Sequence, residues 1–200
     1  MKGRFVAAGL SLLMALPAAV QAADLKRAEE IVGGRCFLCH GMEGEAASAL
    51  YPRLAGQHAE YIAKQLSDFK TGKRKSDTMS GMVGDLSPEE MKALGAFFEQ
   101  KKPNHNSRAD ADLAAVGRYI FTKGNQYSGV ASCTSCHGPK GYGTPQLPRL
   151  AGQQPLYLEN QLKQFNTRER NNDNAVMHSI ASKLTELEVK AVSSYISTLD

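Results

Sequence analysis

The sequence predicts an all-α protein built from two copies of one domain. Apolar residues recur at helical spacing in both halves of the chain, and no run of alternating β-branched residues indicates a strand. Residues 52–57 read Pro-Arg-Leu-Ala-Gly-Gln, and residues 148–153 read the same. A hexapeptide repeated at an offset of 96 predicts that the whole domain is duplicated.

The chain begins with the pattern of a secretory signal peptide. Lys2 and Arg4 precede a largely apolar stretch, and small residues ending at Ala22 offer a cleavage site. We therefore expect residues 1–22 to be removed on export to the periplasm. An uncleaved membrane anchor is the alternative, but the apolar stretch is short for a span and is interrupted by Pro17.

The charge of the mature chain is close to balanced. Removal of residues 1–22 takes away two cations, which reduces the 24 Lys and Arg to 22 against 20 Asp and Glu, a formal charge of +2. Proteins that bind nucleic acid usually present a strongly basic face, so no nucleic-acid partner is expected.

The two halves correspond well beyond the repeated hexapeptide. At the same offset of 96, the residues that match in pairs are Tyr61 and Tyr157, Gln65 and Gln161, Leu66 and Leu162, and Phe69 and Phe165. Farther on, residues 86–90 match residues 184–188 at an offset of 98, so a loop of the second half holds two more residues. We place the linker in the polar stretch 101–108 and predict domains at 23–103 and 104–200.

Helices are predicted at both ends of each domain. Ser87 and Thr185 are each followed by a glutamate three residues later, which is the pattern of a capping box. Apolar stripes at helical spacing are expected to face the core. At the first helices they are Leu25, Ala28 and Val32, then Leu113, Val116 and Ile120; at the last helices they are Met91, Leu94 and Phe98, then Leu187, Ala191, Tyr195, Ile196 and Leu199.

Two C-x-x-C-H motifs account for every cysteine in the chain. The first is Cys36, Cys39 and His40, and the second is Cys133, Cys136 and His137. Two thiols at this spacing can reach the two vinyl groups of one porphyrin, and the adjacent histidine can supply an axial nitrogen to its iron. The motifs therefore predict two covalently bound haem c groups with their iron.

Two other sites use the same cysteine spacing. A thioredoxin-like redox pair needs a βαβ setting, whereas both motifs follow helical segments. A structural zinc site needs a fourth ligand in each domain and a closed tetrahedron.

A sixth ligand decides whether each iron is a closed electron-transfer site or an open catalytic one. The second half contains a single methionine, Met177, seven residues before the segment 184–188. Counting back seven from the matching segment 86–90 gives Met79, which we therefore prefer to Met82. His58, His105 and His178 are not duplicated; we expect exposed or packed side chains, and His178 remains an alternative sixth ligand.

With these motifs, the repeated hexapeptides and the matched Tyr, Gln-Leu and Phe positions, the sequence resembles the dihaem cytochrome c4 family over essentially its whole mature length. The resemblance implies two tandem class I cytochrome c domains related by a pseudo-twofold axis. It implies a periplasmic electron carrier, not an enzyme, that passes electrons from respiratory redox proteins toward a terminal oxidase. Some members attach to the membrane surface.

The resemblance also implies roles for residues near the haems. The carbonyls of Pro52 and Pro148 are expected to accept hydrogen bonds from the axial histidines. Arginine and tyrosine side chains are placed to meet haem propionates, with helix packing or solvation as the alternative: Arg53, Arg149, Tyr61 and Tyr157. The basic run at residues 70–75 either steers an acidic partner or is a solvated loop.

Two rival functions use similar chains. One is the dihaem subunit of a flavocytochrome such as a sulfide dehydrogenase, which would have a flavoprotein partner. The other is a dihaem peroxidase or gas sensor, which needs one open iron site.

We predict that the protein without haem is poorly folded, because domains of this size bury limited apolar surface and the porphyrin supplies part of each core. Circular dichroism of haem-free protein should show reduced helicity and a broad melt. Full helicity with a sharp cooperative melt would refute this prediction.

Overall fold

The computed structural model describes residues 18–103 and 110–200, with side chains from residue 24 onward except at 111. Nearly all of the predicted signal peptide and His105 of the predicted linker lie outside these residues. Within the described part every regular element is a helix, and the one β-type pairing is an isolated bridge between Asn125 and Val130. The predicted all-α class is confirmed. None of the described helices has the length and apolar character needed to cross a bilayer.

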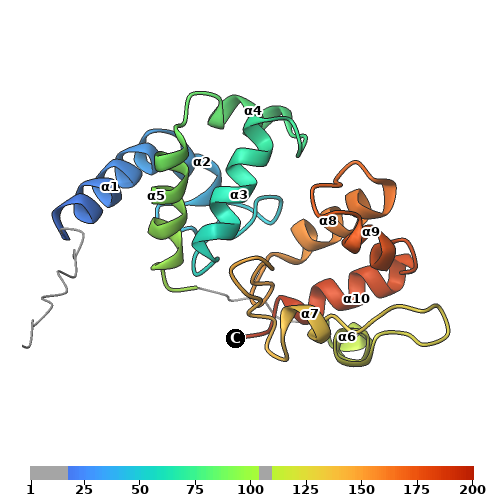
Figure 1. Ribbon diagram of the computed structural model, residues 1–200. Coiled ribbons are helices and arrows are strands. Elements are labelled where there is room, and N and C mark those ends of the chain that lie inside the picture. Colours follow the sequence, from blue (N-terminus) through green and yellow to red (C-terminus); the bar gives the residue numbers. More distant parts are fainter. Residues whose placement is uncertain (1–17, 104–109) are drawn as a thin grey trace, which may run out of the picture.

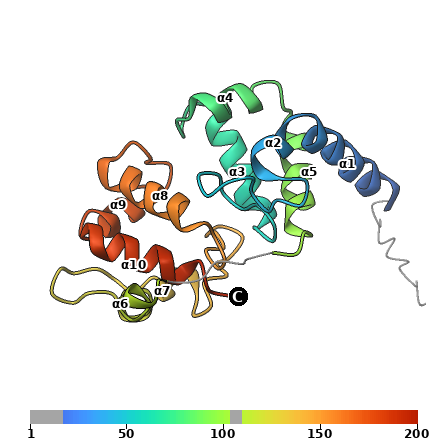
Figure 2. The same ribbon diagram turned by 180° about the vertical axis from the view of Figure 1, so that it is seen from behind.

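Each half of the chain forms its own helical body, as the blue-to-green and yellow-to-red segments of Figures 1 and 2 show. The first contains α1 (Ala18–Ile31), the π-helix η1 (Val32–Cys36), α2 (Phe37–His40), α3 (Ala59–Lys70), α4 (Asp77–Val83) and α5 (Pro88–Glu99). The second contains α6 (Ala111–Lys123), α7 (Thr134–His137), α8 (Pro155–Thr167), α9 (Val176–Ala181) and α10 (Glu186–Ile196).

The last helix of each body organises its core. In the first body α5 packs against both α1 and α3, and in the second α10 packs against both α6 and α8 (Figure 1). The predicted stripe Met91, Leu94 and Phe98 is buried, as are Ala28 and Val32. Both capping boxes are present, with the Ser87 and Thr185 hydroxyls accepting from the backbone N–H of Glu90 and Glu188.

Two residues of the predicted stripes were placed wrongly. Leu187 is 58% exposed, because the buried face of α10 runs through Val189 and Val192 together with the predicted residues Ala191 and Ile196. Val116 is also exposed, and its neighbour Gly117 occupies the face of α6 that meets α10. In α6 the residue that faces α10 is therefore Gly117 and not the apolar Val116.

Gly117 allows α6 and α10 to cross with their backbones in close contact. A Cβ atom at this position would lie 2.1 Å from the Ala191 carbonyl oxygen and 2.7 Å from the Tyr195 Cβ. Neither atom is the end of a flexible side chain, so any larger residue would force the helices apart.

The segment between Ile120 and Cys133 is longer than the matching segment between Val32 and Cys36, and it forms a loop that is tied to α10. Asn125 and Val130 exchange two backbone hydrogen bonds of 2.9 Å each. The Asn125 side chain also donates to the Glu188 carboxylate at 2.7 Å, and Glu188 belongs to the capping box of α10. This contact fixes the loop to the start of the terminal helix.

We predict that Gly117→Val destabilises the second domain by roughly 1–3 kcal/mol or more, the usual cost of overpacking a close contact. Denaturant unfolding of the haem-loaded protein would measure the change. Gly81→Ala is the control, because a Cβ there meets nothing within 4 Å. Equal stability of Gly117→Val and the wild type would contradict the assigned helix crossing.

Candidate haem centres

Each C-x-x-C-H motif forms a short helix that ends at its histidine. The residue that follows, Gly41 or Gly138, has a φ of 76° or 79° and donates its N–H back into the helix. Glycine adopts this left-handed conformation without steric cost, so the chain can turn away directly after the histidine.

The two motif histidines are buried and held in the same way. The Nδ1 atoms of His40 and His137 each lie 3.0 Å from the carbonyl oxygens of Pro52 and Pro148. The hydrogen bonds expected from the family resemblance are therefore present. A carbonyl can only accept, so Nδ1 carries the proton and Nε2 keeps its lone pair for a metal. Burial lowers the pKa of both imidazoles, which favours the neutral form that binds iron.

The cysteines are not paired with one another as disulfides. Burial raises the pKa of the Cys36 thiol and raises that of Cys133 to about 11. Thiols that act as redox pairs need a lowered pKa, whereas a thioether sulfur carries no charge and is stable in such surroundings. Among the described residues no three His, Cys, Asp or Glu side chains cluster as metal ligands. The raised thiol pKa values therefore fit covalent haem better than thiol exchange.

Met79 and Met82, the two candidate sixth ligands of the first domain, differ in how deeply their side chains are buried. Met79 is half-buried and packs against the first hydrophobic core, as does Cys36, while Met82 is 42% exposed. The backbone N–H of Met79 donates to the Ser76 hydroxyl, and that of Met177 donates to the Asp173 carboxylate. Met79 and Met177 thus both lie in a short helix whose start is anchored by a side-chain acceptor.

His178 has a packing role that its counterpart shares. Its Nδ1 lies 3.0 Å from the Phe165 carbonyl oxygen, and at the matching positions of the first domain the Ser80 hydroxyl donates to the Phe69 carbonyl. The same contact made by two different side chains indicates that His178 ties α9 to α8. This shared contact supports the alignment of residues 79 and 80 with residues 177 and 178, and with it the pairing of Met79 and Met177.

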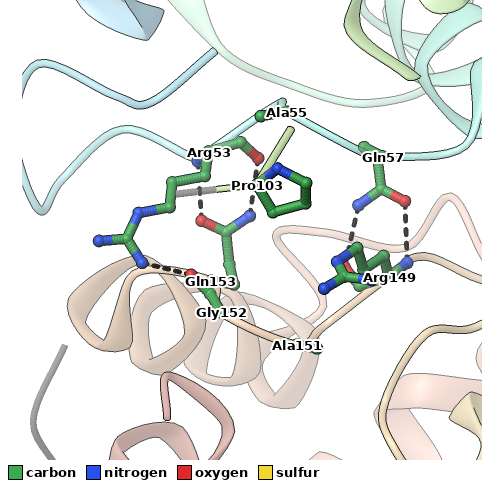
Figure 3. A pocket seen from close by; sticks show the side chains of 8 residues that line it. All are labelled: Arg53, Ala55, Gln57, Pro103, Arg149, Ala151, Gly152 and Gln153. Carbon is green, nitrogen blue, oxygen red and sulfur yellow. Dashed lines mark hydrogen bonds between the residues drawn. The ribbon is translucent and has the colours of Figure 1, made fainter. Parts of the chain in front are cut away.

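The repeated hexapeptides contact each other across the two domains (Figure 3). The Gln57 amide bridges the backbone of Arg149, accepting from its N–H at 2.8 Å and donating to its carbonyl at 2.9 Å. Gln153 bridges the backbone of Arg53 with the same two distances. Each contact is the image of the other, which is the signature of a twofold interface.

A second pair of cross-domain contacts joins two arginines to Tyr61 and Tyr157, the tyrosines that the resemblance assigned to haem propionates or to helix packing. Arg74 donates to the Tyr157 hydroxyl at 3.1 Å, and Arg170 donates to the Tyr61 hydroxyl at 2.8 Å. Both guanidinium groups are buried, so Arg74 is not part of an exposed basic run. The tyrosine hydroxyls serve the domain contact. The sequence contained one indication of this paired role, because Arg74 and Arg170 are also related by the offset of 96.

The pocket between the hexapeptides is too small for a porphyrin, and its lining residues join the two domains. It is lined by Arg53, Ala55, Gln57, Pro103, Arg149, Ala151, Gly152 and Gln153 (Figure 3). One feature nevertheless fits a haem carboxylate nearby. The Nε of Arg149 is buried without a hydrogen-bond acceptor, and a propionate would satisfy it.

Comparisons with known proteins find a cytochrome family model for each half of the chain. Residues 117–200 match the family model for cytochrome c, and residues 23–98 match that for subunit III of cbb3-type cytochrome c oxidase. Cytochrome c4 of Pseudomonas aeruginosa is 36% identical over 95% of this chain and 96% of its own length. The thiosulfate dehydrogenase electron acceptor of Thiomonas intermedia is 33% identical over 93% of this chain and 85% of its own.

The fold agrees as well. The crystal structure of reduced recombinant cytochrome c4 from Pseudomonas stutzeri superposes with a TM-score of 0.83 at 34% identity, covering 88% of this chain and 98% of that one.

We predict that Gln57→Leu and Gln153→Leu loosen the domain contact to a similar extent, because each leaves one buried backbone pair unbonded at a cost of roughly 1–3 kcal/mol per group. Small-angle X-ray scattering should show a larger radius of gyration with unchanged haem spectra. Gln126→Leu, at an exposed position, is the control. A compact double variant would contradict the role of these glutamines.

Proposed function

Because the chain belongs to the cytochrome c4 family, we propose that it shuttles single electrons in the periplasm between respiratory redox proteins and a terminal oxidase or another acceptor. Family membership itself establishes two covalently bound haem c groups and an electron carrier rather than an enzyme. The observation that best supports the shuttle is the identical histidine–proline hydrogen bond in both halves.

Eight residues hold the two haem groups in this proposal. Cys36, Cys39, Cys133 and Cys136 form the thioether bonds, and His40 with Met79 and His137 with Met177 are the axial pairs. Bound haem supplies the iron that gains and loses one electron. The histidines are oriented by Pro52 and Pro148, and fixed axial ligands limit the structural change between oxidation states.

The processing of the chain is part of the same proposal. Residues 1–22 are removed on export, leaving domains 23–103 and 104–200. Helix α1 begins at Ala18, so cleavage after Ala22 shortens a helix that continues to Ile31. The helix keeps the core residues Ala28 and Ile31 after cleavage.

A sulfur-oxidising enzyme is a second candidate for the electron donor. The Thiomonas intermedia relative is named for accepting electrons from thiosulfate dehydrogenase and matches most of this chain. We propose thiosulfate dehydrogenase as one donor to test. Rapid reduction of the haem-loaded protein by that enzyme with thiosulfate would support this pathway, and no reduction would remove it.

We predict that neither iron in the reduced wild type binds carbon monoxide promptly, because methionine fills each sixth position. Met79→Ala and Met177→Ala should each open one iron, so that carbon monoxide shifts the absorption of half the haem. Met82→Ala is the matched control and should bind none.

Two outcomes of this experiment would count against the proposal. Prompt binding at one iron of the wild type would favour a peroxidase or gas sensor. Binding in Met82→Ala but not in Met79→Ala would move the first sixth ligand to Met82.

A further inference from the structure

The two extra residues of the second half lie directly before the methionine assigned to the second iron. The halves correspond at an offset of 96 up to the buried arginines and at an offset of 98 from Met79 and Met177 onward. Residues 75–78 of the first domain are therefore replaced by residues 171–176 of the second. The longer segment leads straight into Met177, so its contacts bear on the position of that ligand.

The longer segment reaches into the first domain through Asn172, which is buried with 3% of its surface exposed. The Asn172 amide donates to the Asp68 carboxylate at 2.6 Å and to the Gln65 side-chain oxygen at 3.0 Å. The amide oxygen accepts from Arg170 at 3.2 Å, and Lys64 donates to the Asn172 backbone carbonyl at 3.0 Å. Because the amide donates only to the first domain, that domain holds this point of the segment in place.

The two domains are not equivalent at this contact. At the offset of 96 the position of Asp68 is occupied by Gln164, so the second domain has no carboxylate there. The shorter segment of the first domain is anchored inside its own domain, where the Ser76 hydroxyl accepts from the Met79 N–H at 3.2 Å. The segment before Met177 is instead tied to a charged side chain of the other domain.

The backbone between this contact and Met177 is strained. Asn174 and Ala175 have φ values of 59° and 63°, and no residue of the matching segment 75–78 has a positive φ. Asparagine tolerates the left-handed region, but alanine is disfavoured there because its Cβ crowds the backbone. Such a turn persists where its surroundings hold it. The Asp173 carboxylate closes the turn by accepting from the Met177 N–H.

We propose that Asn172 is a positioning residue for Met177: its contact with Asp68 of the first domain holds the strained turn in the form in which the methionine binds the second iron. The inference rests on the proposed function, in which Met177 is the sixth ligand. Without the contact the turn relaxes, so the second iron opens while the first stays closed. The ligand of one haem thus depends on a side chain of the other domain.

The test removes the contact from the first domain and leaves every residue of the second unchanged. In oxidised, haem-loaded Asp68→Ala, imidazole should bind one of the two irons at least about tenfold more tightly than in the wild type, because its apparent affinity rises with the fraction of open iron. This binding should remove half of the methionine-to-iron charge-transfer band. Asn172→Ala should behave in the same way. Gln164→Ala, at the matching position of the second domain, is the control and should leave the affinity unchanged.

Combination with the methionine variants identifies the iron that opens. In Met79→Ala protein, Asp68→Ala should still raise the imidazole affinity of the iron that keeps its methionine. In Met177→Ala protein it should not, because the remaining ligand is then Met79. A rise confined to the Met177→Ala background would overturn the proposal. Unchanged affinity in both Asp68→Ala and Asn172→Ala would also overturn it, since contacts within the second domain would then suffice to hold Met177.

Relief of the strained turn gives an independent readout. Ala175→Gly should return the imidazole affinity of Asp68→Ala toward the wild-type value, because glycine adopts a positive φ without steric cost. Absence of this recovery would overturn the role assigned to the strained turn. Gln57→Leu, which leaves the contact between Asp68 and Asn172 in place, should not raise the affinity.

Failure of the proposed function would give a different result. If Met177 is not an axial ligand, Met177→Ala alone leaves the charge-transfer band unchanged. If Met177→Ala removes half of the band while Asp68→Ala leaves the imidazole affinity unchanged, the proposed function stands and only the positioning role of Asn172 is lost.

Discussion

The repeated hexapeptide connects each iron site to the other domain. Its proline carbonyl holds the motif histidine, while the next residue, Arg53 or Arg149, is bridged through its backbone by a glutamine of the opposite hexapeptide. Orientation of the axial ligand and docking of the domains are therefore set within six residues. The proline that holds each motif histidine is directly followed by the arginine whose backbone joins the domains. A displacement of the domain contact would therefore also move the carbonyl that orients the histidine.

The buried arginines add a second layer to this arrangement. Arg74 and Arg170 lie over the rings of Phe69 and Phe165 in their own domains and donate across the interface. Buried cations are tolerated when their donors are hydrogen-bonded, and amide and hydroxyl oxygens accept from both guanidinium groups here. The twofold relation is broken at Asn172, which donates to the buried Asp68, since the position matching Asp68 is Gln164.

Short-range sequence patterns and the internal duplication made much of the fold and of the haem sites predictable. The capping boxes follow from short-range patterns, and the pairing of Met79 with Met177 follows from one offset, to which the shared contacts of Ser80 and His178 add support. The errors arose where tertiary contacts decide. Val116 fits a helical stripe as well as Gly117 does, but only the structure shows that α10 crosses at the glycine. The buried state of Arg74 depends on a partner domain that its local sequence does not contain.

We propose that the chain holds two equivalent, closed haem centres that exchange single electrons. A spectroelectrochemical titration of the haem-loaded protein tests it most directly. Two one-electron steps are expected, each with the spectrum of a low-spin haem that has histidine and methionine ligands. A single step from one haem, or a step from a haem that lacks methionine in the ferric and ferrous states, would contradict it.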